Sequence, residues 1–417
     1  MKEVRIDVFN PVHFHGGLPF QTTYDIEGLK VSPEVHVYHY RDNGLSAFKG
    51  ITDKVDAAAK GWRFQYHKSD NPLDEMLTAK TGNVLVLACP NVDKISVIYQ
   101  AVDRGYELVL SDKPWVIEPE GMPTLEHAVQ TAKEKGTLLI DIMTERYELG
   151  TIIQRLIMMD KGLFGELEQG TLENPAIHKS SVHVLDKSHM GVVRPPQYFD
   201  TRWQGEGIVD VTTHLVDMVH WLMRPDKSVS ADDIHMMNAT RWVTKVPQAD
   251  FEAITKTKET TPFLVYCNGE FAYTLDGRVV VIKDSWDLKG QDDSHYSTIE
   301  GSNIRVEVIK GPNDKYQQVF LTPKVDSIQG LLRGFCGDLV KRDKGFEGVS
   351  FMKEGERFQL SLPGNLYTTH FQHFGEVATQ ALRYLAGQDQ FPRELEYARL
   401  LTKYHVTTTA LKIARGG

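Results

Sequence analysis

The chain has little cysteine, no excess of basic charge and no long apolar run. Its three cysteines among 417 residues are too few and too irregularly spaced for a disulfide framework or a CxxC metal site. The formal net charge of −9 argues against a nucleic-acid partner. No segment reaches the roughly 18 consecutive apolar residues that a membrane span requires. We therefore expect neither a disulfide-rich scaffold, nor a nucleic-acid-binding protein, nor a membrane-spanning one.

The N-terminus also lacks the apolar segment of a signal peptide, since charged residues run directly into a predicted strand. Together with the sparse cysteines, this predicts a cytoplasmic protein. A periplasmic location stays open, because a cloned chain can lose its leader and begin at an added Met.

The chain is too long for one ordinary hydrophobic core, so we expect two domains. The first, residues 1–147, alternates between helical periodicity and apolar segments that predict strands at 4–9, 34–40, 83–88, 107–110 and 137–142. This alternation predicts an α/β fold with a Rossmann-type, doubly wound parallel sheet. Ligands of such sheets bind at the carboxyl ends of the strands.

The second domain, residues 148–417, lacks this alternation. Short apolar segments joined by turns predict an open, mainly antiparallel sheet in an α+β domain that ends in helices near 370–385 and 395–414. We expect the segment 207–222 to pack on one face of that sheet. The other face is expected to form a subunit interface, because a large sheet face seldom stays bare.

The segment 207–222 predicts a helix with a polar stripe. Asp210, His214, Asp217 and Trp221 stand at i, i+4, i+7 and i+11, which places them within about 60° of one another on a helix. Burying charge without a partner costs several kcal/mol, so the stripe needs a reason to exist. From the residues alone, it is either a core histidine bridging two acids or a general base held by its own carboxylate.

Four motifs stand at the ends of predicted strands or on this helix. They are Asp112-Lys113-Pro114, Cys89-Pro90-Asn91, the segment 143–147 that follows the last predicted strand of the first domain, and Asp210-x-x-x-His214-x-x-Asp217. In order and spacing they resemble motifs of the Gfo/Idh/MocA family of sugar and cyclitol dehydrogenases, over nearly the whole chain. The resemblance implies an NAD- or NADP-dependent oxidoreductase that acts on a small carbohydrate and assembles as a homodimer or homotetramer.

The resemblance also implies roles for particular residues. The catalytic group carried over from the family is Lys113, Asp210 and His214. We expect the cofactor to contact Asn10, His13, Phe14, His15, Tyr40, Arg41, Cys89, Asn91, Asp112, Lys113 and Pro114. We expect the substrate to contact Arg146, Tyr147, Trp203 and Asp217, although Trp203 could equally serve to anchor its loop.

Two positions depart from the family pattern. The chain lacks the usual GxGxxG, since Asn10, Val12 and His15 occupy the corresponding positions and glycine occurs only at 16 and 17. The dinucleotide therefore either binds differently, with His13 and His15 as donors, or has been lost. At the end of the second strand, Arg41 favours a 2′-phosphate and Asp42 a bare ribose, which leaves NAD and NADP both open.

A metal site is not expected. His13 and His15 have the spacing of a chelating pair, but no acid or cysteine near them in sequence supplies the third ligand that zinc needs.

Three functions remain. The first is oxidation or reduction at a secondary hydroxyl or ketone of a sugar, glycoside or cyclitol, with His214 as base, Asp210 orienting it and Lys113 bound to the substrate oxygen. The second is glycoside cleavage through a keto-sugar with recycled NAD. The third is a sugar-sensing protein that has lost its cofactor.

Overall fold

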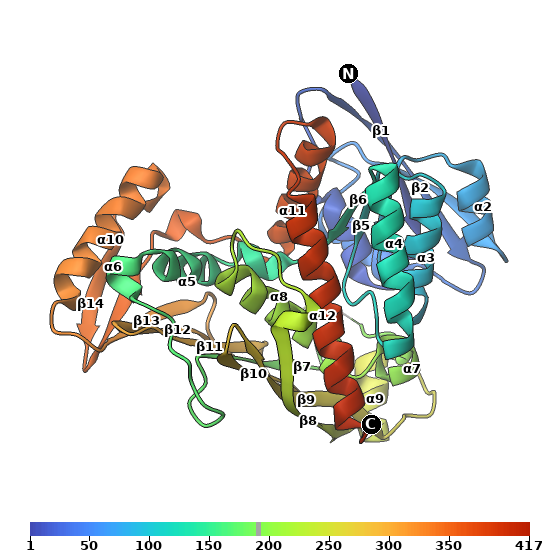
Figure 1. Ribbon diagram of the computed structural model, residues 1–417. Helices are drawn as coiled ribbons and strands as arrows, with labels where there is room; N and C mark the ends of the chain where they lie inside the picture. The colour runs from blue at the N-terminus through green and yellow to red at the C-terminus, as the bar shows by residue number, and fades with distance from the viewer. Residues whose placement is uncertain (189–192) are drawn as a thin grey trace.

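The first domain is built on a six-stranded sheet in which all strands run parallel (Figure 1). The computed structural model describes residues 1–188 and 193–417. The strand order β3-β2-β1-β4-β5-β6 is that of a doubly wound dinucleotide-binding sheet and confirms the predicted fold class. The strands are β1 (Lys2–Phe9), β2 (Leu29–Tyr40), β3 (Arg63–Ser69), β4 (Val84–Leu87), β5 (Leu108–Ser111) and β6 (Leu138–Asp141).

Helices cover both faces of this sheet, as the apolar strands require. All four residues of β4 are buried, in keeping with its central place in the sheet. Residues 43–69 contain one α-helix and the edge strand β3. The helical elements are η1 (Phe14–Gln21), α1 (Ser46–Lys54), α2 (Pro72–Ala79), α3 (Asn91–Asp103), η2 (Pro119–Gly121), α4 (Met122–Lys135) and η3 (Thr144–Tyr147).

The second domain is built on a nine-stranded sheet with the order β14-β15-β13-β12-β11-β7-β10-β9-β8. Only the β7–β10 pair is parallel, so the predicted, mainly antiparallel sheet is confirmed. Its strands are β7 (Ile177–Val184), β8 (Ile234–Lys245), β9 (Leu264–Leu275), β10 (Arg278–Asp287), β11 (Ser294–Glu300), β12 (Ile304–Lys310), β13 (Gln318–Pro323), β14 (Ser350–Glu354) and β15 (Arg357–Ser361).

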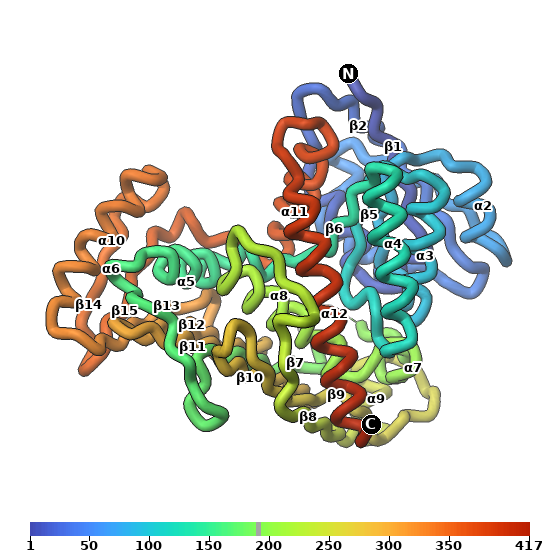
Figure 2. The backbone as a smooth tube through the Cα atoms, viewed as in Figure 1, coloured from blue at the N-terminus to red at the C-terminus, as the bar shows by residue number. Residues whose placement is uncertain are grey.

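Many of the remaining helices lie against the second sheet, and α12 runs alongside both domains (Figure 2). None of the helices within residues 1–188 and 193–417 is long and apolar enough to cross a membrane. They include α5 (Leu149–Met159), α6 (Lys161–Phe164), η5 (Pro196–Phe199), α7 (Thr201–Gln204), η6 (Gly207–Val209), α8 (Thr212–Met223), η7 (Ala231–Asp233), α9 (Gln248–Thr255), α10 (Ile328–Arg342), η8 (Lys344–Phe346), η9 (Gly364–Leu366), α11 (His370–Ala386) and α12 (Arg393–Ala414).

The last two helices tie the domains together. Phe374 and Leu382 of α11 pack into the core of the first sheet, although we assigned residues 148–417 to the second domain. Tyr404 of α12 packs in the same domain, whereas Val406 and Leu411 of that helix join the core of the second. The end of the chain therefore fixes how the two sheets face each other.

The predicted helix over 207–222 is wrong at its start. Residues 207–209 form the 3-10 turn η6, α8 begins at Thr212, and Asp210 lies between them with a non-helical ψ of −88°. The physical reason is the close approach of the chain to β9, where a Cβ atom on Gly207 would lie 1.9 Å from the carbonyl oxygen of Cys267. The chain turns there before it enters the helix, so Asp210 precedes the helix that carries His214 and is not part of it.

Gly207 should tolerate no side chain. Because the colliding atoms belong to the β9 backbone, we predict that Gly207→Ala lowers the free energy of unfolding by about 1–3 kcal/mol, the usual cost of overpacking. Thermal melts should show this as a lower Tm. As a control, Gly334→Ala on the exposed face of α10 meets no atom within 4 Å and should stabilise by about 0.5–1 kcal/mol. A Tm of Gly207→Ala equal to that of wild type would contradict the packing described.

Candidate active site

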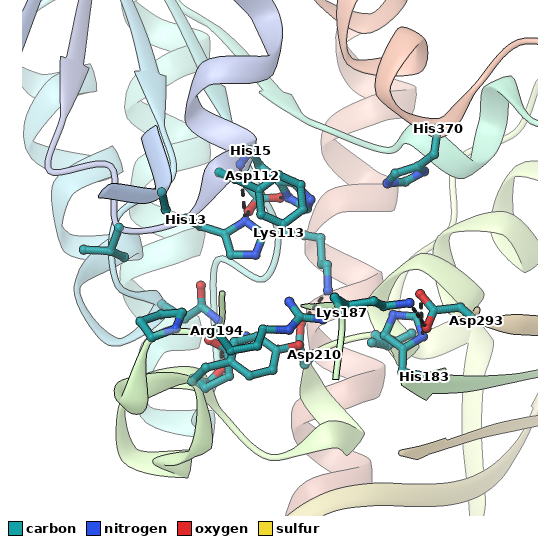
Figure 3. Close-up of a pocket in the computed structure, with 18 of the residues that line it drawn as sticks. His13, His15, Asp112, Lys113, His183, Lys187, Arg194, Asp210, Asp293 and His370 are labelled. Carbon is teal, nitrogen blue, oxygen red and sulfur yellow. Dashed lines mark hydrogen bonds and ion pairs between the residues drawn. The ribbon is translucent and has the colours of Figure 1, made fainter. Parts of the chain in front are cut away.

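A cavity of about 1070 Å³ lies between the domains at the carboxyl edge of the parallel sheet (Figure 3). The ends of β1, β2, β4 and β5 line one side of it, and α7, α8 and strands of the second sheet line the other. The volume is at or above the upper end of ordinary ligand pockets, about 300–1,000 Å³. The cavity has room for two ligands at once.

Twelve of the residues predicted to be catalytic, or to contact the cofactor or the substrate, line this cavity. They are Asn10, His13, Phe14, His15, Tyr40, Cys89, Asn91, Asp112, Lys113, Trp203, Asp210 and His214. The five that do not are Arg41, Pro114, Arg146, Tyr147 and Asp217.

Lys113 and Asp210 meet across the domain boundary. Lys113 follows β5, and its Nζ donates to Asp210 Oδ1 at 2.5 Å, while Gln204 Nε2 donates to Asp210 Oδ2 at 2.9 Å. Burial alone would lower the pKa of Lys113, but Asp210 and Asp112 outweigh it and raise that pKa. Lys113 is therefore an ammonium at neutral pH.

His214 stands apart from Asp210. Its Nδ1 is buried without a hydrogen-bond partner among the described residues, so the expected orientation of the imidazole by Asp210 is not observed. Burial and the nearby charge of Lys113 hold the pKa of His214 well below its usual range. The imidazole is neutral at pH 7 and available to accept a proton.

The loop after β1 forms the part of the cavity nearest the first sheet. Asn10 takes a left-handed conformation with φ of 38° and accepts from Asn43 Nδ2 at 2.7 Å. His15 Nδ1 lies 3.1 Å from Asp112 Oδ1, and His13 Nδ1 lies 3.8 Å from Asp112 Oδ2. Burial would raise the pKa of Asp112, but His15, Lys94 and His13 outweigh it and depress that pKa. Asp112 is an anion that lies beside both histidines.

The two glycines of this loop serve packing rather than phosphate binding. A Cβ on Gly17 would lie 2.4 Å from Ile51 Cγ2 on α1, and one on Gly16 would lie 3.1 Å from Pro11 Cβ. They let η1 pack closely against α1 and the strand ends.

Sequence reasoning missed Lys94, which is 1% exposed on the first turn of α3. Its Nζ donates to Asn91 Oδ1 at 2.8 Å and to the carbonyl of Lys113 at 3.3 Å, so it joins the turn after β4 to the turn after β5. The sequence signal for this contact was the i+3 spacing of Lys94 from Asn91, which places the two side chains on one face of a helix.

Arg146 and Asp217 bind each other instead of a substrate. Arg146 forms a bidentate pair with Asp217 at 2.7 and 2.8 Å, and Lys403 Nζ lies 3.2 Å from the same carboxylate. Burial would raise the pKa of Asp217, but Arg146 and Lys403 outweigh it and lower that pKa. The structure gives no support to the predicted substrate role, because Asp217 does not line the cavity and its carboxylate is already paired with Arg146 and Lys403.

The other three predicted residues also lie elsewhere. Arg41 points to the surface and pairs with Asp70 at 2.7 Å. Pro114 is buried behind the cavity wall, and Tyr147 packs against the first core with its ring 6.4 Å from that of His373.

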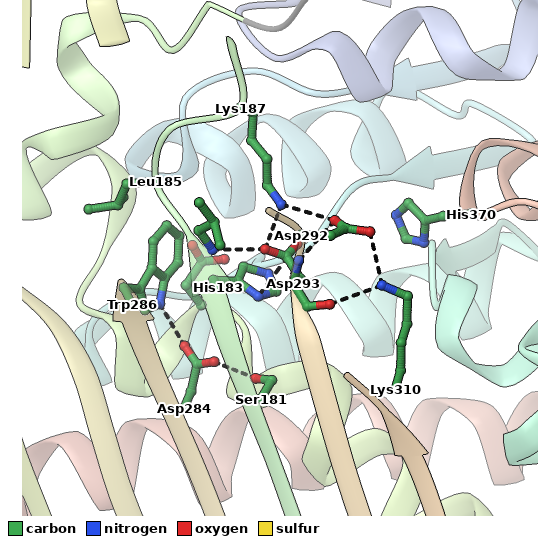
Figure 4. Close-up of polar contacts among 12 residues, drawn as sticks. Ser181, His183, Leu185, Lys187, Asp284, Trp286, Asp292, Asp293, Lys310 and His370 are labelled. Atoms are coloured by element: carbon green, nitrogen blue, oxygen red, sulfur yellow. Dashed lines mark hydrogen bonds and ion pairs between the residues drawn. The ribbon is translucent and has the colours of Figure 1, made fainter. Parts of the chain in front are cut away.

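The far wall carries charges that the sequence did not reveal (Figure 4). Lys187 Nζ lies 2.6 Å from Asp293 Oδ1, and Lys310 Nζ lies 2.9 Å from Asp292 Oδ2. Burial lowers the pKa of His183 to about 4, and burial with Glu145 raises the pKa of Glu148 to about 8. These groups come from strand ends, from the start of α5 and from the turn between β10 and β11.

The comparisons with known proteins agree with this architecture. A family profile described as "Putative oxidoreductase C terminal domain" matches residues 153–415. A "putative oxidoreductase" from Parabacteroides merdae ATCC 43184 has 33% sequence identity and a TM-score of 0.89, with 99% of this chain and 98% of that chain covered. The search of curated proteins gave no match.

More distant solved structures share the fold alone. One is a "putative oxidoreductase" from Thermotoga maritima with 14% identity, a TM-score of 0.65 and coverage of 99% of this chain and 98% of that chain. Another is levoglucosan dehydrogenase in complex with NADH and levoglucosan, with 11% identity, a TM-score of 0.65 and coverage of 100% and 98%.

Fold and site together define a two-domain oxidoreductase architecture with a Rossmann-type first domain. The chain belongs to the oxidoreductase family of Gfo/Idh/MocA type that carries this C-terminal domain.

The new assignment of Asp217 can be tested by stability. We predict that Asp217→Ala lowers the free energy of unfolding by about 3–5 kcal/mol, because it leaves the partly buried Arg146 with only Glu396 and the buried Lys403 with only Asp141 as counter-charge. A thermal melt measures this, with Asp25→Ala at an exposed position as the control. If both variants melted like wild type, the network would not be structural.

Proposed function

We propose that this protein is an NAD-dependent oxidoreductase that transfers a hydride between the cofactor and a secondary alcohol carbon of a carbohydrate. The observation that carries the proposal is the meeting of Lys113 and His214 in one cavity, beside the carboxyl ends of a doubly wound sheet. The family and the fold shared with levoglucosan dehydrogenase support it.

The residues present fit a dinucleotide without the usual glycine motif. The turns after β1, β2, β4 and β5 all face the cavity, which is where such sheets hold their cofactors. His13 and His15 would bind the phosphates, and Asn91 with Lys94 would support the nicotinamide end. Asp42 lines the cavity whereas Arg41 pairs with Asp70 outside it, which favours a ribose hydroxyl over a 2′-phosphate and hence NAD.

The chain's own residues supply the proton chemistry. When bound, the nicotinamide ring exchanges a hydride with the alcohol carbon. The neutral His214 accepts the hydroxyl proton, and the Lys113 ammonium donates a hydrogen bond to the same oxygen and stabilises its developing negative charge. Asp210 keeps Lys113 charged and directed, so it is a positioning residue for the lysine.

Trp203 of α7 is exposed and lines the cavity, which supports a role in stacking on a sugar ring. A Lys–His pair of this kind favours an enzyme over a cofactor-free sensor, which has no need of it. The identity of the sugar and the homodimeric or homotetrameric assembly stay predictions.

Loss of either catalytic side chain should abolish most turnover. We predict that Lys113→Ala and His214→Ala each lower kcat by about 100-fold or more, as losses of general acid-base groups do. The assay follows formation of reduced nicotinamide with a panel of sugars, glycosides and cyclitols. Controls are Lys258→Ala and His235→Ala, which remove exposed side chains of the same types. Turnover within a few-fold of wild type in either catalytic variant would disprove the assignment.

The residual activity of Lys113→Ala should also have a shifted pH profile. The positive charge of Lys113 lowers the pKa of His214, so its removal raises that pKa. Protonation then inactivates the base at higher pH, and we expect the acid limb of kcat/KM to move upward. An unmoved acid limb would mean that His214 is not the titrating base.

Cofactor choice should follow Asp42. We predict that the full chain binds NAD⁺ at least about tenfold more tightly than NADP⁺, a difference of about 1.4 kcal/mol, and that Asp42→Ala removes most of this preference. Isothermal titration calorimetry measures both constants. Arg41→Ala is the matched control and should leave the preference unchanged. If Arg41→Ala lost the preference for NAD⁺ and Asp42→Ala kept it, the assignment of ribose recognition to Asp42 would be wrong.

A further inference from the structure

A second group of ligating side chains lies next to the loop after β1, where the rings of His15 and His370 are 6.4 Å apart. Glu148 stands at the N-cap of α5, and His370 and His373 stand three residues apart on the first turn of α11. One ligand atom from each lies within 4.8 Å of the other two. Figure 3 shows the His370 ring directed into the cavity.

His373 is prepared as a ligand. It is 0% exposed, and its Nδ1 has no hydrogen-bond partner among the described residues, although a buried polar atom without one costs free energy. Its other nitrogen, Nε2, lies 2.8 Å from the Thr368 hydroxyl. A proton on Nε2 donated to Thr368 leaves the Nδ1 lone pair free. A fixed partner for the second ring nitrogen is the usual support of a metal-bound histidine.

The free nitrogen faces a carboxylate at the right distance. His373 Nδ1 lies 3.6 Å from Glu148 Oε1. Two ligands bound to one zinc ion at about 2.1 Å in a tetrahedral arrangement are about 3.4 Å apart. Glu145 adds a second carboxylate, with Oε1 3.9 Å from His370 Nδ1. Glu145 and Glu148 both line the cavity, and a bound cation would reduce the repulsion between their carboxylates.

We propose that Glu148, His370 and His373 bind one divalent transition-metal ion, with Zn²⁺ as the best match to two imidazoles and one carboxylate. Glu148 and His370 both line the cavity, so the fourth coordination position faces the space between the domains. Three protein ligands and an open position are the pattern of zinc sites that bind small molecules. A hydroxyl or carbonyl oxygen of a ligand in the cavity would complete the coordination.

The competing cluster, His13, His15 and Asp112, is a weaker candidate. The Nδ1 of His13 already accepts from the backbone N–H of His15, so that lone pair is not free for a metal ion. The structure does supply Asp112 as the third ligand that the sequence argument did not find near this pair. An experiment must therefore distinguish the two clusters.

Metal binding is tested on the full chain without a histidine tag, after treatment with a chelator and desalting. We expect one Zn²⁺ per chain, measured by titration against a chromophoric chelator, and visible absorption bands when Co²⁺ replaces it. His373→Gln and Glu148→Gln should each weaken binding by more than about 100-fold, since loss of even an outer-shell partner costs 10–100-fold. Glu148 is partly exposed, so its substitution tests the site even if His373→Gln fails to fold.

Two control variants complete the design. His127→Gln removes an exposed imidazole on α4 and should bind Zn²⁺ as wild type does. His13→Gln should also leave the stoichiometry at one. Absence of binding at micromolar Zn²⁺, or binding that survives Glu148→Gln and His373→Gln but is lost in His13→Gln, would overturn the proposal. No dinucleotide or sugar is present in this experiment, so its outcome is independent of the proposed redox function.

Discussion

The ion pair between Lys113 and Asp210 is the interaction on which the rest of the site depends. It joins residues 97 positions apart, one at the end of a parallel strand and the other at the turn before α8. Because each side chain is largely buried, neither charge is stable there without the other. The pair therefore joins the two domains at the wall of the cavity. Helix α12 supports the same arrangement, because it packs against both domains.

The pair also influences the protonation states of the groups that line the cavity. Lys113 stays an ammonium and depresses the pKa of His214, so one cation and one neutral base line the same space. This is the combination that proton removal from an alcohol needs. Glu148 with His370 and His373 forms a further polar group in the same region, 6.4 Å from His15 by the rings of His15 and His370, and it includes an unpartnered nitrogen. The cavity thus holds groups suited to proton transfer and, beside them, groups suited to a cation.

Much of the fold and part of the site could be predicted from the sequence. Continuous apolar strands and short motifs located the parallel sheet, Lys113 and His214, since these depend on local pattern. The true partners of Asp210 and Asp217 could not be predicted, because Gln204, Arg146 and Lys403 reach them only after the chain has folded. Helical periodicity also failed at residues 207–210, where a close approach to β9 overrides it. The metal cluster joins helix starts more than 220 residues apart, so no local spacing indicates it.

The most direct test of the central interaction is the pH dependence of Lys113 acylation by a small amine-reactive reagent, quantified by mass spectrometry in wild type and in Asp210→Asn. Burial lowers the pKa of this lysine, and Asp210 reverses that effect. The midpoint of labelling should therefore fall to lower pH in Asp210→Asn. Equal midpoints in the two proteins would show that Asp210 does not hold the charge of Lys113, and the site described above would lose its basis.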